Sequence, residues 1–145
     1  YLKGYSDAMM LSGIVLSGGN AAWRGKELPD GVLGGILTAN NIARLDLSGT
    51  EMVVLSACQS GQGKATSEGL YGLQRAFKKA GVGTMVMALW SVSDKVATEF
   101  MTAFYEQLAS KQCKWNKRKA FENAKSIIRE KYPDPFYWAA FVMLD

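Results

Sequence analysis

The sequence predicts an α/β domain with a mostly parallel sheet flanked by helices. Four consecutive apolar residues, Met52–Leu55, two of them β-branched, are typical of a strand covered on both faces. A second apolar run, Thr84–Trp90, follows a segment with helical periodicity. The remaining segments complete the order strand, helix, strand, helix, helix, strand, which favours right-handed crossovers between parallel strands.

Composition limits the class of protein further. With 145 residues, 48% of them hydrophobic and 21% charged, the chain has the size and balance of one globular domain. No apolar run approaches the roughly 20 residues that cross a bilayer. The first residues resemble neither a signal peptide nor a natural start, so we expect residues 1–145 to be a piece of a longer chain.

The first third of the chain predicts little regular structure. "GIVLSGGN" (13–20) predicts a short strand that runs into a turn. The next fifteen residues contain Gly, Pro and an Asp-Gly pair, and they predict either a plain loop or a hairpin-like one. In "LTANNIARLDL" (37–47), Thr38 suits an N-cap for one or two helical turns.

The remaining two thirds carry stronger periodic signals. A helix is expected over 66–83, capped by Thr66 or Ser67 and ended at Gly81. A long helix over 91–110 and another over 117–132, which Pro133 stops, precede a last strand over 138–144. The apolar face of the long helix is formed by Val96, Phe100, Ala103, Phe104 and Leu108.

Cys58 lies just after the first buried strand and is the leading candidate for chemistry. In α/β sheets, functional groups collect beyond the carboxyl ends of strands, and the loop Ser91–Asp94 follows the neighbouring strand in the same way. A nucleophilic cysteine needs a base, yet the chain contains no histidine. The plainest alternative is a buried cysteine that acts as a small hydrophobic residue.

Three other chemical interpretations of Cys58 fit poorly. A nucleotide phosphate loop that ends at Gly63-Lys64 would need a glycine where Cys58 stands. It would also need a metal-binding Ser or Thr where Ala65 stands. A cysteine phosphatase needs arginine six residues later, where Lys64 stands without the bidentate guanidinium. A nucleophile elbow needs two glycines that "SACQS" lacks. A caspase-like peptidase fits better, because "SACQSGQG" has small residues beside which a peptide could bind.

Long stretches of the sequence resemble the CHAT family of caspase-like peptidase domains, which are related to separase and often attached to TPR repeats. The resemblance is carried by "SGIVLSG" (12–18), "LSACQSGQG" (55–63), "SEGLYGLQRAFKKAG" (67–81), "LWSVSD" (89–94) and "WAAFVML" (138–144). It implies a caspase-like fold that is incomplete at its N-terminal side, because the family's His-Gly pair and further strands precede the segment matching "GIVLSG". It also suggests a bacterial source.

The resemblance implies a role for three residues. Cys58 matches the nucleophile, and its histidine would lie upstream of Tyr1. Asp94 matches the acid that lines the S1 pocket in separase, where it would pair with a P1 arginine; N-capping of the following helix, which Ser93 could also perform, is the structural alternative. Trp90 is expected either to form a wall of that pocket or to belong to the core.

These observations lead to two hypotheses. The first is a cysteine endopeptidase, inactive as this chain alone, that prefers Arg or Lys at P1 and needs neither metal nor cofactor. Its partners would be a peptide or protein substrate, the upstream part of the same protein, and TPR repeats. The second is a non-catalytic scaffold or partner-binding module. Two cysteines without a disulfide or zinc pattern favour a reducing, cytoplasmic location.

One charged segment fits neither hypothesis. "KQCKWNKRK" (111–119) contains five basic residues and no acidic one, with Trp115 in its middle. It could contact phosphates, but a solvated loop that opens a helix is the simpler interpretation, and nucleic acid is not the expected partner. Cys113 lies in the same segment and suggests no chemistry.

Overall fold

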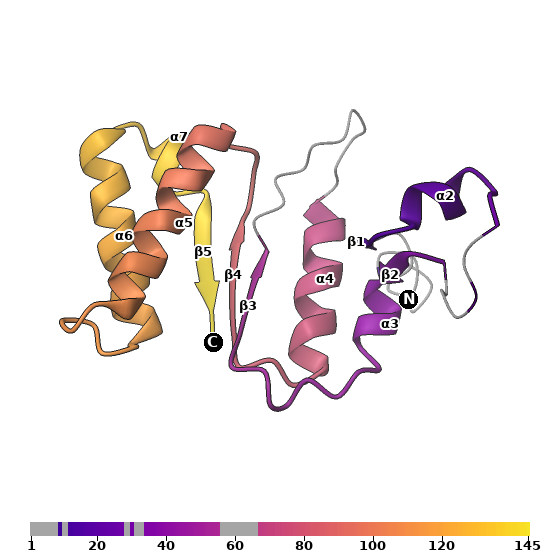
Figure 1. Ribbon diagram of the computed structural model, residues 1–145. Coiled ribbons are helices and arrows are strands. Elements are labelled where there is room, and N and C mark those ends of the chain that lie inside the picture. Colours follow the sequence, from indigo (N-terminus) through magenta and orange to yellow (C-terminus); the bar gives the residue numbers. More distant parts are fainter. Residues whose placement is uncertain (1–8, 10–11, 28–29, 31–33, 56–66) are drawn as a thin grey trace. The chain divides into compact units, whose positions relative to one another are not determined.

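The structure, a computed structural model, describes residues 9, 12–27, 30, 34–55 and 67–145 (Figure 1). Cys58 and the rest of 56–66 therefore lie outside the described residues. The protein is a mixed α/β protein that divides into two compact units. The first unit takes the residues up to Glu51 together with the helix and turn that end at Gly83, and the second takes β3 (Met52–Leu55) and Thr84–Asp145.

The first unit contains a two-stranded antiparallel sheet. β1 (Gly13–Val15) pairs with β2 (Ile36–Thr38), so the strand expected at 13–20 is confirmed in its first part. The prediction of a loop over 21–35 is wrong for its first residues, because Gly19–Trp23 forms the short helix α2. Gly18 precedes α2 with φ 90°, a left-handed conformation that glycine adopts without strain, and this sharp turn allows a helix to begin in a glycine-rich segment.

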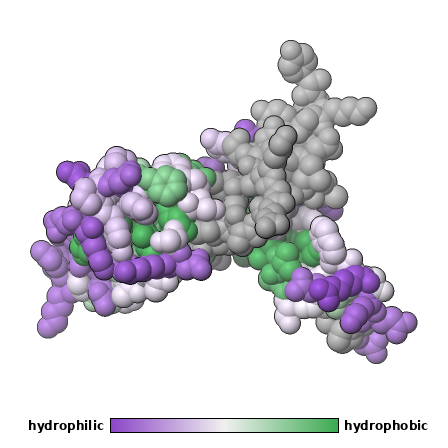
Figure 2. All heavy atoms as spheres, turned by 90° about the horizontal axis from the view of Figure 1, so that it is seen from above, coloured by the Kyte–Doolittle hydropathy of each residue, from purple (hydrophilic) through white to green (hydrophobic). Residues whose placement is uncertain are grey.

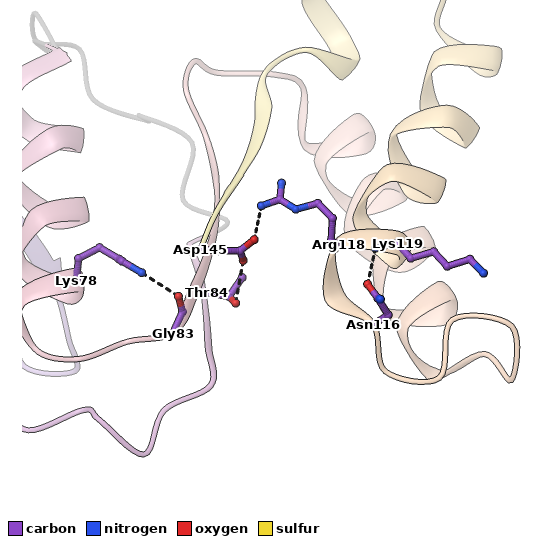
Figure 3. A network of polar contacts seen from close by, with 7 residues as sticks. All are labelled: Lys78, Gly83, Thr84, Asn116, Arg118, Lys119 and Asp145. Carbon is purple, nitrogen blue, oxygen red and sulfur yellow. Dashed lines mark hydrogen bonds and ion pairs between the residues drawn. The ribbon is translucent and has the colours of Figure 1, made fainter.

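Two more helices are described in this unit, and the signals expected at the start of one and at the end of the other are confirmed. Thr38 caps α3 (Ala39–Ile42) in a capping box with Asn41. α4 (Ser67–Lys79) is followed by Gly81 with φ 100°, and a side chain there would approach Ser48 Cα to 2.9 Å. The Lys78 ammonium donates a hydrogen bond to the carbonyl oxygen of Val82 at 3.2 Å. It donates a second one to the carbonyl oxygen of Gly83 at 2.9 Å (Figure 3). These bonds fix the turn by which the chain leaves α4.

The second unit is built on a three-stranded sheet in the order β3–β4–β5. β3 pairs in parallel with β4 (Thr84–Ala88), with Met52 opposite Thr84 and Leu55 opposite Met87. This pair confirms the two strands expected there. Among the described residues β3 forms a ladder with β4 alone, so its other edge has no partner strand in that part of the chain.

The expectation of a mostly parallel sheet is not met over the described residues. β5 (Phe141–Leu144) runs antiparallel to β4, as β2 does to β1. The reason is the pair of helices α5 (Asp94–Ala109) and α6 (Lys117–Lys131) between the two strands (Figure 1). One crossover helix returns the chain to the start of a strand, whereas two consecutive helices return it to the end from which it left.

The expected last strand begins three residues too early. Pro135–Trp138 forms one turn of helix, α7, and β5 starts only at Phe141. Asp134 caps α7 by accepting a hydrogen bond from Phe136 N at 2.9 Å, and Pro135 occupies the first helical position, where its missing N–H costs nothing. The Asp-Pro pair therefore overrides the strand propensity of the aromatic residues that follow.

The core of the second unit lies between the sheet and the α5–α6 pair. The Phe100 ring stacks on Phe141 at 3.8 Å between centroids and meets the Phe121 ring edge-on at 5.6 Å. All three side chains are buried, as is Val86 at the middle of the central strand. The apolar face predicted for α5 is confirmed, because the residues buried on that helix are Val96, Phe100, Ala103, Phe104 and Leu108.

Candidate active site

The candidate site lies where the chain leaves β3 and β4. Because these strands are parallel, both lead to the same edge of the sheet. Leu55 is the last described residue of β3, and Cys58 follows it by three positions, outside the described residues. What the structure describes of the site is therefore the segment after β4 and the elements that contact it.

Asp94 is the first residue of α5, and the structure shows which residue caps that helix. Ser93, not Asp94, is the N-cap: its hydroxyl accepts a hydrogen bond from Val96 N at 3.4 Å. The Asp94 side chain is exposed and forms no ion pair among the described residues. The α5 macrodipole favours a carboxylate at this position, so Asp94 presents a charge that no described cation neutralises.

Trp90 connects the end of β4 to α7. Its indole N–H donates a hydrogen bond to the carbonyl oxygen of Phe136 at 2.9 Å, and the two rings lie 6.2 Å apart. Trp90 is half-buried and packs against the core of the unit. Trp90 therefore belongs in part to the core, and its role as a wall of the substrate pocket stays a prediction.

An apolar surface beside Trp90 is a feature that the sequence analysis missed. Phe136 is 51% exposed and Leu89 is 45% exposed, although both are large hydrophobic residues. Leu89 N donates to Ala140 O at 2.8 Å, which holds the strand end against the start of β5. Figure 2, viewed from above, shows apolar side chains gathered on the unit that contains α5–α7. The Asp-Pro start of α7 was the signal that could have placed Phe136 here.

A charged cluster ties α5 to the end of α6, just before α7. Lys131 Nζ lies 2.9 Å from Glu99 Oε1. The hydrogen bond from Lys131 lowers the pKa of Glu99, and the same bond raises the pKa of Lys131. Burial raises the pKa of the neighbouring Tyr132. The Glu99–Lys131 ion pair therefore fixes the end of α6 against α5, just before the segment that carries α7.

The described residues contain no group of three or more His, Cys, Asp or Glu side chains that could hold a metal ion.

Residues 4–145 match the CHAT domain family, which is nearly the whole chain. This chain belongs to the CHAT family. The CHAT domain here is 33% identical over 114 residues to mouse tetratricopeptide repeat protein 28, and 29% identical over 111 residues to the human protein of that name. Each match covers 75% of this chain and 4% of the relative. No solved structure matches this CHAT domain.

The comparisons confirm the family and bear on two further expectations. Both relatives are named for tetratricopeptide repeats, in agreement with the association of CHAT domains with TPR repeats. Both are mammalian, so they do not support the bacterial source that the resemblance suggested. Among the described residues no helix is long and apolar enough to span a membrane.

Proposed function

We propose that this CHAT domain is the C-terminal portion of a caspase-like cysteine endopeptidase that cleaves after Arg or Lys. The observation that carries the proposal is the parallel pairing of β3 with β4. The chain leaves both strands at the same edge of the sheet, which supports a nucleophile after β3 and a specificity residue after β4 that act on one peptide. The proposal includes a caspase-like fold and the assignment of residues 1–145 to the C-terminal portion of one domain. It also includes the roles of Cys58 as nucleophile and of Asp94 in substrate binding.

In this mechanism the Cys58 sulfur attacks the carbonyl carbon of the scissile peptide bond. A histidine from the upstream part of the protein takes the thiol proton and then transfers it to the leaving amine. The oxyanion accepts hydrogen bonds from the Cys58 N–H and from a second backbone N–H. Water then hydrolyses the acyl-enzyme, which releases the new carboxylate and restores the thiol. No step requires a metal or a cofactor.

The preference for a basic P1 residue rests on Asp94. An exposed carboxylate without a described cationic partner can pair with a guanidinium through two parallel hydrogen bonds, which lysine cannot form. The half-buried Trp90, four positions before Asp94 in the sequence, would offer an apolar wall for the stem of that side chain. Since Ser93 caps α5, Asp94 is not needed for that structural task.

The upstream part of the protein is an essential partner in this proposal. The 145 residues contain no histidine, so the general base must come from elsewhere. The edge of β3 that has no partner among the described residues could accept a further strand, which would carry that base to the carboxyl edge. TPR repeats would belong to the same protein, and a protein substrate would bind across the completed site.

The experiment compares the full-length protein with three variants on peptides that contain a single Arg, Lys or Ala at P1. We expect Cys58→Ala to abolish cleavage and Asp94→Asn to lower kcat/KM for Arg by about 100-fold or more, a loss of roughly 3 kcal/mol. Ser93→Ala is the matched control and should keep the order of P1 preference. Cleavage by Cys58→Ala at the rate of the unaltered protein would refute the proposal.

The alternative function is a non-catalytic CHAT domain that binds a partner. The absence of histidine from this chain is the observation that favours it. Under this alternative the full-length protein cleaves no peptide, and Cys58→Ala leaves partner binding unchanged. The P1 series therefore separates the two functions directly.

A further inference from the structure

The turn between α5 and α6 presents an exposed tryptophan on a strained backbone. We call Ser110–Lys119 the basic loop; it comprises this turn and the first residues of α6. Trp115 is 70% exposed, and both Lys114 and Trp115 adopt left-handed conformations, with φ of 48° and 61°. Bulky residues rarely adopt this conformation, and such strain marks functional segments more often than ordinary turns.

The strained backbone is held in place by polar contacts beneath it. The Ser110 hydroxyl accepts a hydrogen bond from Cys113 N at 3.1 Å and donates one to Gln107 O at 2.7 Å. Cys113 is buried, and Asn123 Nδ2 lies 3.5 Å from its sulfur. Lys114 N donates to Ser110 O at 3.0 Å. Trp115 is therefore presented by a fixed turn.

The basic loop also concentrates the charge of the chain. It contains five basic residues and no acidic one, whereas the whole chain has a net charge of +4, so the rest has 12 basic and 13 acidic residues and a net charge of −1. Arg118 is paired with Asp145, while the Lys119 side chain extends in another direction (Figure 3). Lys119 Nζ donates a hydrogen bond to Gln112 O at 3.1 Å. Lys111 and Lys114 are exposed and have no ion-pair partner in the described part of the chain.

The first turn of α6 contains no acidic residue, although the N-terminal end of a helix favours negative charge. Lysines here oppose the macrodipole, the left-handed backbone opposes folding, and the exposed tryptophan gains little stability from burial. Three unfavourable features in one ten-residue segment are explained together if an external anionic group binds there. The nearest acidic residues along the chain, Glu106 and Glu122, lie on the two helices and outside the loop.

We propose that the basic loop binds a short acidic protein segment that carries an apolar or aromatic residue. Trp115 contacts that residue, and the ammonium groups of Lys111, Lys114 and Lys119 pair with carboxylates on either side of it. The net positive charge of the chain comes from this loop, because the other residues sum to −1, and a compact charged patch suits a short segment. A nucleic acid strand needs a continuous basic track, and the remaining surface is weakly acidic in total.

This binding surface is separate from the candidate active site. Asp94 begins α5 and the basic loop follows its last residue, so a helix of 16 residues, about 24 Å long, separates them (Figure 1). An extended segment that occupied both places would need at least about seven intervening residues. The proposed binding does not depend on peptidase activity, so either proposal can fail without the other.

The test measures binding of a fluorescein-labelled, glutamate-rich peptide with one central phenylalanine to the full-length protein, by fluorescence anisotropy. Trp115→Gly, which suits the left-handed backbone, should weaken binding about tenfold. The double variant Lys111→Gln with Lys114→Gln should weaken it by a similar factor and flatten its dependence on salt. Trp23→Ala and Lys26→Gln are matched controls, because Trp23 is 82% exposed and both lie in the first unit.

Three outcomes would overturn the proposal. The first is that the unaltered protein does not bind the peptide more tightly than its glutamine counterpart. The second is that the basic-loop variants bind as well as the controls while circular dichroism shows all of them folded. The third is that labelled oligothymidine binds more tightly than the peptide and loses affinity in the same variants, which would assign the loop to nucleic acid.

Discussion

The indole N–H of Trp90 donates a hydrogen bond to the carbonyl oxygen of Phe136, and this bond joins the end of β4 to α7. Trp90 and Phe136 are 46 residues apart in the sequence. Trp90→Phe keeps a ring but removes the donor, which leaves the carbonyl oxygen of Phe136 without this partner. We expect a loss of about 1 kcal/mol of stability. Amide hydrogen exchange over α7 should accelerate, while exchange in the buried strand β4 stays unchanged.

The pair Ser93 and Asp94 separates helix capping from substrate recognition. Ser93→Ala removes the N-cap of α5 and should lower the free energy of unfolding by about 1 kcal/mol. Asp94→Asn keeps the cap and should change stability by about 0.5 kcal/mol or less, through the lost interaction with the helix dipole. Denaturant titration of both variants measures this difference. A larger loss for Asp94→Asn than for Ser93→Ala would contradict the assignment of the cap.

Phe100 is the centre of the core of the second unit. Its ring contacts Phe104, Phe121 and Phe141, and its side chain is fully buried. Phe100→Ala should therefore cost about 3–5 kcal/mol. Tyr105→Ala, on the same helix and 49% exposed, should cost about 1 kcal/mol or less. Equal losses for the two variants, measured by chemical denaturation, would show that this core does not hold the unit together.

The Glu99–Lys131 ion pair predicts a dependence of stability on pH. The folded-state pKa of Glu99 is lowered, so its contribution is fully present above the unfolded pKa and is lost as the pH falls through the folded value. The pKa of Lys131 is raised, so its contribution is present at neutral pH and is lost as the pH rises through the folded value. Glu99→Gln should remove the acid-side part of this dependence in thermal melts recorded across the acidic range. An unchanged acid profile would contradict the pairing.

The left-handed backbone at Lys114 predicts a stabilising substitution. Glycine adopts φ 48° without strain, so Lys114→Gly should raise stability by about 0.5–1 kcal/mol despite the entropy that glycine adds to the unfolded chain. Lys111→Gly, in the same turn at a position without positive φ, should lower stability instead. A higher melting temperature for Lys114→Gly together with a lower one for Lys111→Gly would confirm the strain. A lower melting temperature for both variants would contradict it.

The sequence predicted the elements that local signals define. Helix capping and helix termination depend on residues only a few positions apart. The structure confirms the three such signals at Thr38, Gly81 and Pro133. The α5 face was predictable because helical periodicity repeats over four turns. CHAT family membership was predictable from long matching segments, and the comparison with known families confirms it.

The errors arose where distant parts of the chain decide the outcome. The direction of β5 depends on the number of helices between it and β4, and no local pattern within β5 encodes that direction. The contact between Trp90 and Phe136 joins segments that no local pattern relates. Cys58 lies outside the described residues, so its role remains a proposal that depends on the upstream part of the protein.

Covalent labelling of Cys58 tests the proposed function most directly. The full-length protein would be incubated with an irreversible thiol-directed peptide probe ending in arginine, and the modified residue would be identified by mass spectrometry. We expect labelling of Cys58, much slower labelling of Cys58 in Asp94→Asn, and no labelling of the buried Cys113. A probe that leaves Cys58 unmodified, or that labels it equally well with arginine replaced by alanine, would contradict a Cys58 peptidase with a basic P1 preference.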